Sequence, residues 1–383
     1  MLNSLLIKPA GPDCNMRCAY CFYLPKASLF HESKVHRMSY KVLEALTVQY
    51  LRIAGDIASF CWQGGEPTLM GLEFFERAMH LQRANVRSGQ ALSNTIQTNG
   101  LLINHDWARF LKRHGFLVGV SLDGPKELHD HYRKDGAQRG SFDRVMRAIE
   151  CLREHDVEFN ILCVLNDVTV KHPERLIEFF LSHDLRYLQF IPCVEWDESG
   201  ERIAPFSVTP EAYGEFLCRA FDMWHGDGVP QFYERFFNDV LAVYAGYGMP
   251  TCVMKRRCGD YVVVEYNGDV YACDFFVEPQ WRYGNLLESP LEELLKIPVA
   301  LRFRERKRLL SRECLSCRWL HICNGGCPKY RMFAGGVECV NYFCGAYKRF
   351  FSHSHRRYLR MAERLNVVAH TKSMLHWWRQ RSH

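Results

Sequence analysis

Three cysteines near the N-terminus are spaced so that they can bind one metal centre together. Cys14, Cys18 and Cys21 form a C-x3-C-x2-C loop. Three thiolates at this spacing suit a [4Fe–4S] cluster in which one iron keeps an open position. A tetrahedral zinc ion would need a fourth protein ligand, for which His36 is a distant candidate. The loop therefore indicates an iron–sulfur site, with a zinc knuckle or three buried thiols as alternatives.

A second set of cysteines lies in the last third of the chain, where nine of the 17 cysteines fall between Cys252 and Cys344. Eight of these nine have spacings that suit two four-thiolate sites, which either iron–sulfur clusters or structural zinc ions could occupy. The residues alone leave both metals open. The eight are Cys252, Cys258, Cys273, Cys314, Cys317, Cys323, Cys327 and Cys344.

The elements that must position these cysteines alternate between strands and helices up to about residue 225. Each predicted strand is apolar or β-branched and ends near Gly, Asn or Pro, and the segments between have helical spacing. Six β-then-α units in a row indicate a parallel sheet or an incomplete (β/α) barrel, with the chemistry at the C-terminal strand ends. The predicted strands are Ser4–Lys8, Ser59–Gln63, Ser93–Thr98, Leu117–Leu122, Phe159–Leu165 and Tyr187–Pro192. The predicted helices are Ser39–Ala54, Gly71–Asn85, His105–His114, Ser141–His155 and Val170–His183, with start signals at Asn104 and Ser141.

The pattern changes after a predicted helical connection over residues 209–247. Tyr261–Tyr266 and Val270–Ala272 flank Asn267-Gly268 and predict a β-hairpin. We therefore expect a barrel over 1–225, a cysteine-rich domain over 226–350 and a basic helical tail over 351–383.

The composition of the chain excludes several classes of protein. With 383 residues, 48% apolar and 24% charged, it can build sizeable cores and is neither disordered nor fibrous. It has no long apolar run and no signal peptide, so we expect no membrane partner and a cytoplasmic location. Cysteine clusters in that compartment bind metals or do redox chemistry more often than they form disulfides.

The first cysteine loop resembles that of the radical S-adenosylmethionine (SAM) superfamily, which has this loop after its first barrel strand. In that family the open iron binds SAM, and an electron from the cluster splits SAM to give a 5′-deoxyadenosyl radical. The resemblance implies a partial (β/α)6 barrel. It also implies that Tyr20 contacts SAM, Gly65 of the Gln63-Gly-Gly-Glu-Pro67 motif its amino group, and Ser121 and Arg133 its carboxylate. Val194 stands where relatives usually have Leu near the adenine.

The second cysteine set resembles the SPASM-type extension of peptide-modifying radical SAM enzymes, which carries two auxiliary [4Fe–4S] clusters. The resemblance implies one cluster on Cys252, Cys258, Cys273 and Cys327, and another on Cys314, Cys317, Cys323 and Cys344. The fold class that we expect is thus α/β, a partial barrel followed by a small irregular domain with the hairpin. The remaining cysteines are expected in the core: Cys61, Cys151, Cys163, Cys193, Cys218 and Cys339.

Several longer motifs in the right order look like those of the anaerobic sulfatase-maturating enzymes, from about Leu5 to Phe351. These enzymes oxidise a Cys or Ser of a sulfatase polypeptide to Cα-formylglycine. The resemblance implies that the radical takes a Cβ hydrogen, that Asp274 acts as the general base, and that the auxiliary clusters accept electrons. Tyr23 and Gln63 are placed to meet the substrate peptide. Without the neighbouring Cys273, Asp274 would be interpreted as a turn-capping residue.

The implied partners are a sulfatase polypeptide and an electron donor such as flavodoxin or ferredoxin. Three clusters would add a charge of about −5, which offsets the formal +6 of the chain, so the excess of Lys and Arg does not indicate nucleic-acid binding. Two alternatives remain. Another SPASM maturase, forming thioether or carbon–carbon crosslinks, would have the same clusters. A non-catalytic iron–sulfur electron carrier would leave the open iron and Arg133 without a use.

Overall fold

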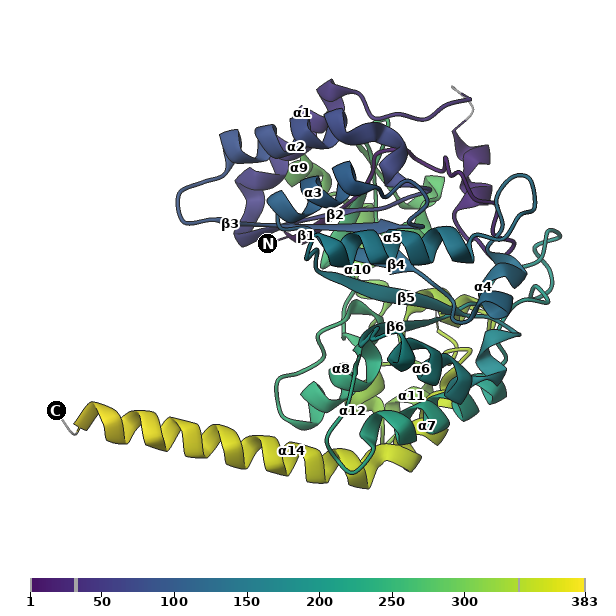
Figure 1. Ribbon diagram of the computed structural model, residues 1–383, viewed down its shortest axis with the longest axis vertical. Helices are drawn as coiled ribbons and strands as arrows, with labels where there is room; N and C mark the ends of the chain where they lie inside the picture. The colour runs from purple at the N-terminus through teal and green to yellow at the C-terminus, as the bar shows by residue number, and fades with distance from the viewer. Residues whose placement is uncertain (1, 31–33, 337, 382–383) are drawn as a thin grey trace.

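The computed structural model describes residues 2–30, 34–336 and 338–381, without the side chains of Asn3 and of residues 366–381. Its centre is one ten-stranded sheet with the order β10-β9-β8-β1-β2-β3-β4-β5-β6-β7. Strands β1 to β7 run parallel, and β8 pairs with β1 in parallel. The β8–β9 and β9–β10 pairs are antiparallel. The sheet is curved and does not close (Figure 1). The predicted fold class is confirmed.

The strands are β1 (Leu2–Lys8), β2 (Ala54–Trp62), β3 (Ala91–Thr98), β4 (Leu117–Ser121), β5 (Phe159–Leu165), β6 (Tyr187–Pro192), β7 (Tyr233–Glu234), β8 (Tyr261–Glu265), β9 (Asp269–Tyr271) and β10 (Arg282–Asn285). The helices of the barrel part are α1 (Tyr40–Ile53), α2 (Gly71–Asn85), α3 (His105–Arg113), α4 (Lys126–Tyr132), α5 (Phe142–Glu154) and α6 (Pro173–Ser182). The later helices are α7 (Pro210–His225), α8 (Arg235–Tyr244), α9 (Leu291–Leu294), α10 (Pro298–Arg306), α11 (Arg312–Leu315), α12 (Leu320–Cys323), α13 (Pro328–Met332) and α14 (Cys344–Arg381).

The helices of the barrel part lie along one side of the sheet (Figure 1) and bury one apolar stripe each. Capping side chains fix where several begin. Asn104 caps α3 by accepting from the Trp107 N–H at 3.0 Å, as predicted. Ser141 does not cap α5 with its side chain. Instead, Asp130 accepts from the Ser141 and Phe142 N–H groups at 2.8 and 2.9 Å. A cap supplied from outside the helix cannot be read from the helix sequence.

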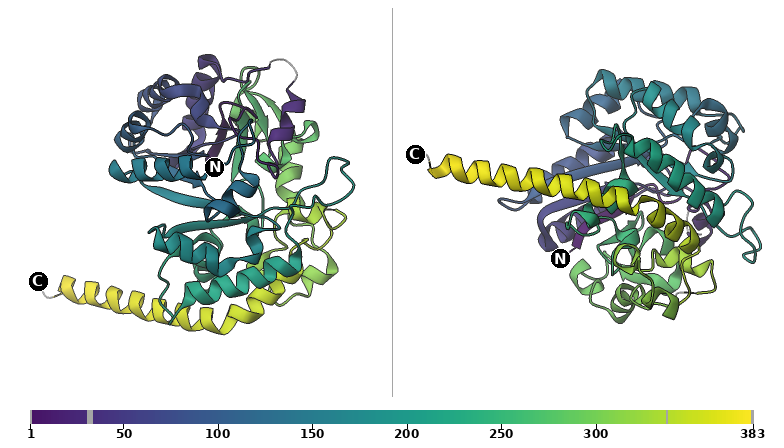
Figure 2. Two further views of the ribbon diagram at one scale, coloured as in Figure 1. Left: turned by 45° about the vertical axis from the view of Figure 1, so that its right-hand side comes forward. Right: turned by 90° about the horizontal axis from the view of Figure 1, so that it is seen from below.

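The predicted hairpin forms, but it is not an isolated feature of the cysteine-rich region. Strand β8 pairs with β1 in parallel, from Ser4 opposite Tyr261 to Lys8 opposite Glu265. The same sheet therefore runs from the barrel part into the cysteine-rich part, which lie side by side (Figure 2). The domain boundaries near residues 225 and 350 remain a prediction.

Three further segments differ from expectation. A short helix, α4, precedes Arg133, and the connection over 209–247 is two helices separated by the short strand β7. Helix α14 packs on α7, where Phe350 and Tyr358 contact Phe221. Part of the basic tail is paired, because Arg357 donates to Asp222 of α7 at 2.5 Å.

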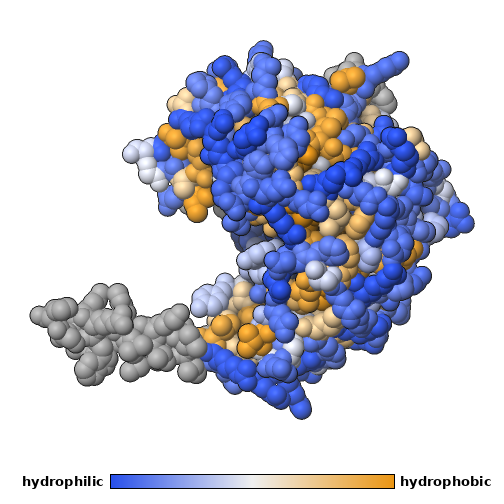
Figure 3. All heavy atoms as spheres, in the orientation of Figure 1, coloured by the Kyte–Doolittle hydropathy of each residue, from blue (hydrophilic) through white to orange (hydrophobic). Residues whose placement is uncertain are grey.

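Most of the face drawn in Figure 3 is hydrophilic, with apolar residues scattered between. Among the described residues, none of the helices combines the length and the apolar character that crossing a bilayer requires.

Candidate active site

The first cysteine loop follows β1, at the C-terminal edge of the sheet. Cys14, Cys18 and Cys21 line one pocket together with Gly65. Burial raises the pKa of the Cys14 thiol to about 12 and that of Cys18 to about 11. Three partly buried cysteines around one pocket fit a metal cluster, because the metal supplies the positive charge that favours the thiolate form.

The Gly64-Gly65 turn after β2 holds this loop by its backbone. The Gly65 N–H donates to the Gly11 carbonyl at 2.8 Å, and the Glu66 N–H donates to the Asp13 carbonyl at 2.8 Å. A Cβ atom on Gly65 would lie 1.9 Å from the Asp13 carbonyl oxygen. Only glycine permits this approach of two backbones, so the turn has a structural use in addition to the expected SAM contact.

Glu66 joins the ends of β2 and β3 through a buried carboxylate. The carboxylate accepts hydrogen bonds from the Thr68 and Thr98 hydroxyls at 2.6 and 2.8 Å and from the Asn99 N–H at 2.8 Å. The Asn99 amide in turn lies 3.6 Å from Cys14 Sγ. The sequence analysis singled out the motif that contains Glu66 but assigned this carboxylate no role, because nothing in the local sequence indicates which strand end it reaches.

Asp123 brings two expected SAM-contacting residues together. Its Oδ2 accepts from Arg133 Nε at 2.8 Å and from the Tyr20 hydroxyl, and its Oδ1 accepts from the Val164 N–H at 2.9 Å. Asp123 is 1% and Arg133 7% exposed, so this is a buried ion pair. Within the described part of the chain, the terminal amino groups of Arg133 have no hydrogen-bond partner. They remain available to a ligand carboxylate.

The other residues expected around SAM or substrate lie at strand ends. Ser121 is the last residue of β4 and is partly buried. Gln63 follows β2, and its N–H donates to the Ile7 carbonyl at 2.9 Å. Val194 follows β6 and is fully buried.

A buried lysine that sequence reasoning missed lies beneath the first cysteine loop. Lys8 is 1% exposed, and its Nζ lies 3.2 Å from the centroid of the Tyr23 ring. The Tyr23 hydroxyl donates to Glu265, whose carboxylate is fully buried. Burial raises the pKa of Glu265 to about 7, although Lys8 acts in the opposite direction. The sequence did contain a sign of this burial. Lys8 lies two residues after the apolar Leu6 in the same strand, so both side chains point to the same face of the sheet.

Asp274 follows β9 and lies beside a cysteine of the second set. Its Oδ1 accepts from the Tyr261 hydroxyl at 2.9 Å and from the Cys273 thiol at 3.3 Å. The Tyr261 oxygen also lies 3.0 Å from Cys273 Sγ. No donor to Asp274 Oδ2 is found among the described residues, so this oxygen is open to a proton from another molecule.

The eight cysteines of the second set separate into two groups in space. Four of them line one pocket: Cys314, Cys317, Cys323 and Cys344. In the other group, Cys252, Cys258 and Cys273 all lie near Cys327, whose charge raises the pKa of each thiol in addition to the larger effect of burial. Each group offers four thiolates around one point, a donor set that fits a four-iron cluster.

The remaining six cysteines lie outside these groups. Cys151, Cys163, Cys193 and Cys218 are buried, and Cys61 and Cys339 are partly buried.

Two contacts connect the first cysteine loop to the second cysteine region. The centroids of the Phe22 and Phe275 rings lie 5.1 Å apart, and Lys329 Nζ lies 5.2 Å from the Phe22 ring centroid and 4.3 Å from that of Phe275. Lys329 also pairs with Glu195, which follows β6. The segments that carry the first cysteine loop, Asp274 and the end of β6 are thus neighbours.

Residues 9–180 match the model of the radical SAM superfamily, and residues 252–318 match that of an iron–sulfur cluster-binding domain named SPASM. The chain is 38% identical to the serine-type anaerobic sulfatase-maturating enzyme of Bacteroides thetaiotaomicron, over 91% of this chain and 88% of that one. It is also 38% identical to the cysteine-type enzyme of Clostridium perfringens, over 94% of this chain and 99% of that one.

Solved structures also include a similar sulfatase-maturating enzyme. The structure of anSMEcpe with bound AdoMet and the Cp18Cys peptide has a TM-score of 0.88 at 37% identity, covering 95% of this chain and 100% of that one. Streptococcus suis SuiB bound to its precursor peptide SuiA has a TM-score of 0.62 at 17% identity, covering 88% of this chain and 74% of that one. The second likeness shows a shared fold alone.

Proposed function

The chain belongs to the anaerobic sulfatase-maturating enzymes of the radical SAM superfamily, and we propose that it oxidises a Cys or Ser of a sulfatase polypeptide to Cα-formylglycine. Serine loses one Cβ hydrogen, the hydroxyl proton and two electrons in total. Cysteine loses the equivalent hydrogens from Cβ and sulfur, and water then replaces the sulfur, which leaves as hydrogen sulfide. Both routes end at the same aldehyde.

The cysteine groups would hold three [4Fe–4S] clusters. The first, on Cys14, Cys18 and Cys21, keeps one iron for SAM, and the eight later cysteines hold two auxiliary clusters. When bound, these groups and SAM supply a 5′-deoxyadenosyl radical for the Cβ hydrogen and acceptors for the electrons that leave the substrate.

Asp274 is the proposed general base, and its position carries the proposal. Its Oδ1 accepts from the Tyr261 hydroxyl and the Phe275 N–H, which orients the carboxylate and leaves Oδ2 to take the substrate S–H or O–H proton. The acceptor of the proton thereby lies next to a cysteine assigned to a redox centre. Loss of this proton makes the substrate easier to oxidise.

SAM would be bound at the ends of β2, β4 and β6. Arg133 is oriented by its ion pair with Asp123 and offers its terminal amino groups to the SAM carboxylate. Ser121 would add a hydroxyl to the same carboxylate, and the Gly65 backbone would meet the amino group. Tyr20 and Val194 complete the proposed contacts.

The substrate peptide would enter the space between the first cysteine loop and Asp274. Gln63 and Tyr23 remain the proposed substrate contacts. Tyr23 is itself buried on Lys8, so it would contact the peptide from the floor of this space. Lys8 would stabilise the negative charges that gather there, because its ammonium group lies close enough to Glu265 and Asp274 for both to raise its pKa against the larger effect of burial.

The test is anaerobic incubation of the reconstituted enzyme with SAM, reduced flavodoxin and a sulfatase-derived peptide deuterated at Cβ of the target Cys or Ser. We expect an aldehyde product by mass spectrometry and deuterium in 5′-deoxyadenosine. A peptide with Ala at the target position is the control. A crosslinked product, or deoxyadenosine without aldehyde from either peptide, would contradict the proposed reaction.

A further inference from the structure

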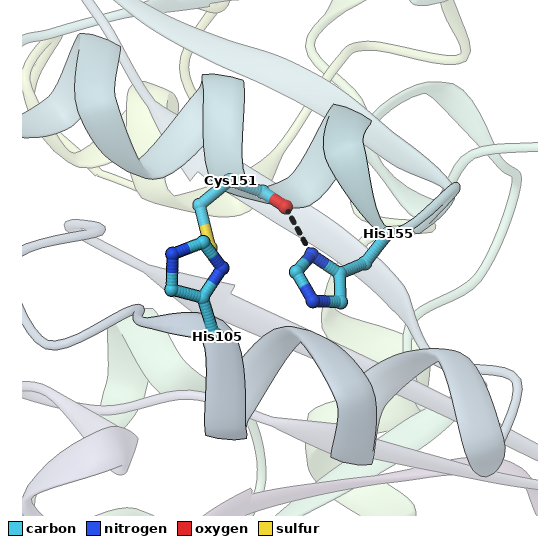
Figure 4. A group of neighbouring side chains, drawn as sticks. All are labelled: His105, Cys151 and His155. Carbon is cyan, nitrogen blue, oxygen red and sulfur yellow. Dashed lines mark hydrogen bonds between the residues drawn. The ribbon is translucent and has the colours of Figure 1, made fainter.

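A cluster of metal-ligating side chains lies outside the active site, on the outer helical layer. His105 is the first residue of α3, and Cys151 and His155 lie one turn apart at the end of α5. The three side chains converge between the two helices (Figure 4). Their ligand atoms all lie within 4.8 Å of one another. None of the three residues contributes to the site described above.

The geometry is already close to that of a tetrahedral metal site. His105 Nδ1 lies 3.6 Å from Cys151 Sγ. A zinc ion bound at usual Zn–N and Zn–S lengths separates its nitrogen and sulfur ligands by about 3.6 Å. Only His155 must move inward, by about an ångström, and its ring is partly exposed, so a change of side-chain torsion is sufficient.

His155 has the support that metal-binding histidines usually have. Its Nδ1 lies 3.0 Å from the Cys151 carbonyl oxygen. A hydrogen bond from one ring nitrogen to a backbone carbonyl fixes the tautomer and leaves the other nitrogen, Nε2, with a lone pair for a metal. Figure 4 shows the Cys151 sulfur next to the His105 ring, with the His155 ring alongside, and the centroids of the two rings lie 5.2 Å apart.

We propose that His105, Cys151 and His155 bind a divalent transition metal of the zinc class. Two imidazoles and one thiolate are a borderline-soft donor set that Zn²⁺ prefers over Mg²⁺ or Ca²⁺. A water molecule would complete the tetrahedron, because Glu154 Oε2 lies 3.8 Å from His105 Nδ1 but outside the group of three ligand atoms. The positive charge of Arg109 acts on the Cys151 thiol and would oppose binding of a cation. Arg109 is itself paired with the exposed Asp106.

The metal would fasten α3 to α5. Helix α3 begins a few residues after Asn99, whose amide reaches Cys14 of the first cysteine loop. A bound metal therefore anchors the far end of the short segment that carries Asn99, without entering the active site.

The test uses the anaerobic enzyme with all its iron in place, so that added metal does not occupy empty cluster sites. Co²⁺ is titrated first, because a thiolate ligand gives cobalt an intense charge-transfer absorption, and Zn²⁺ is then used to displace it. We expect one added metal per chain, a thiolate band, and a thermal unfolding midpoint raised by Zn²⁺. Cys151→Ala should remove the band, and His155→Gln should weaken binding by about tenfold or more, since even an outer partner of a metal ligand is worth about 10–100-fold.

The matched control is Cys218→Ala, another buried helical cysteine outside the three cluster groups. It should bind Co²⁺ as the unmodified chain does. Equal binding by Cys151→Ala, or cobalt bound without a thiolate band, would overturn the proposal, because the metal would then lie elsewhere or on the surface histidines alone.

Discussion

Lys8 Nζ lies 3.2 Å from the centroid of the Tyr23 ring, and both residues are buried. The ring shields a cation that has no hydrogen-bonded carboxylate among the described residues. This cation instead faces the carboxylates of Glu265 and Asp274, which both raise its pKa while burial lowers it. Lys8 thus lies between the first cysteine loop and the proposed base, where the two carboxylates favour its charged form.

Replacing Lys8 by Met should slow aldehyde formation. Without the ammonium group the pKa of Glu265 rises further above 7, and the negative charges at the site lose their counter-charge. Loss of the desolvated cation–π contact with Tyr23 should in addition lower the free energy of unfolding by about 2 kcal/mol. Turnover of the peptide is measured against Lys41→Met, which changes an exposed lysine of α1. Equal rates in the two variants would rule out the proposed role.

Replacing Asp274 by Asn should uncouple SAM cleavage from product formation. The amide oxygen can still accept from Tyr261, but the side chain can no longer take a proton. A general base contributes about 10²–10⁴-fold, so aldehyde should fall by that factor while 5′-deoxyadenosine continues to form. Asp260→Asn, which alters an ion pair with Lys255, is the matched control. Full aldehyde yield from Asp274→Asn would show that another group is the base.

Gly65→Ala should disturb the first cysteine loop. The new Cβ would overlap the Asp13 carbonyl at 1.9 Å, so the loop must move. Overpacking costs about 1–3 kcal/mol, and SAM binding should be lost together with about a third of the iron. Gly136→Ala is the control, because no atom lies within 4 Å of its Cβ position. Iron content and the unfolding midpoint are measured for both variants. Equal values in Gly65→Ala and Gly136→Ala would show that Gly65 is not required for the position of the loop.

The buried pair of Asp123 and Arg133 should behave non-additively. Asp123→Asn leaves a buried guanidinium without its counter-charge, which costs about 3–5 kcal/mol. The double variant with Arg133→Gln removes both charges and should recover part of this free energy of unfolding, although not SAM affinity. Unfolding and SAM titration are followed in the two single variants and the double variant. Strictly additive losses of stability would mean that the two side chains are not coupled.

Stability should fall between about pH 5 and pH 8 because of Glu234. Its buried carboxylate accepts from the Phe237 and Phe190 N–H groups at 2.8 and 3.2 Å, and burial raises its pKa from 4.5 to about 7. The folded chain holds this proton more tightly than the unfolded one. The stabilisation is therefore complete below pH 4.5 and is lost as the pH rises through 7. Glu234→Gln should flatten this part of the profile, and parallel curves for the two proteins would contradict it.

Local sequence patterns predicted the six barrel strands and the helices between them because each is buried on a regular face. The cysteine spacing indicated metal sites but left the metal open, and the grouping of the eight later thiols came from the resemblance to the SPASM-type extension. Patterns could not predict that β8 pairs with β1, because that pairing joins distant parts of the chain. The same limit hid the roles of Glu66 and Asp123, because most of their partners come from distant parts of the chain.

The position of β1 between β2 and β8 affects the order in which the molecule assembles. The ribosome releases the N-terminus first, so β1 can pair with β2 long before Tyr261–Glu265 has been made. Until then β1 lacks its neighbour β8. The segment that carries Cys14, Cys18 and Cys21 follows β1 directly and is made at the same stage. Iron delivered to a nascent chain would therefore meet the first cysteine loop before β8 is present beside β1.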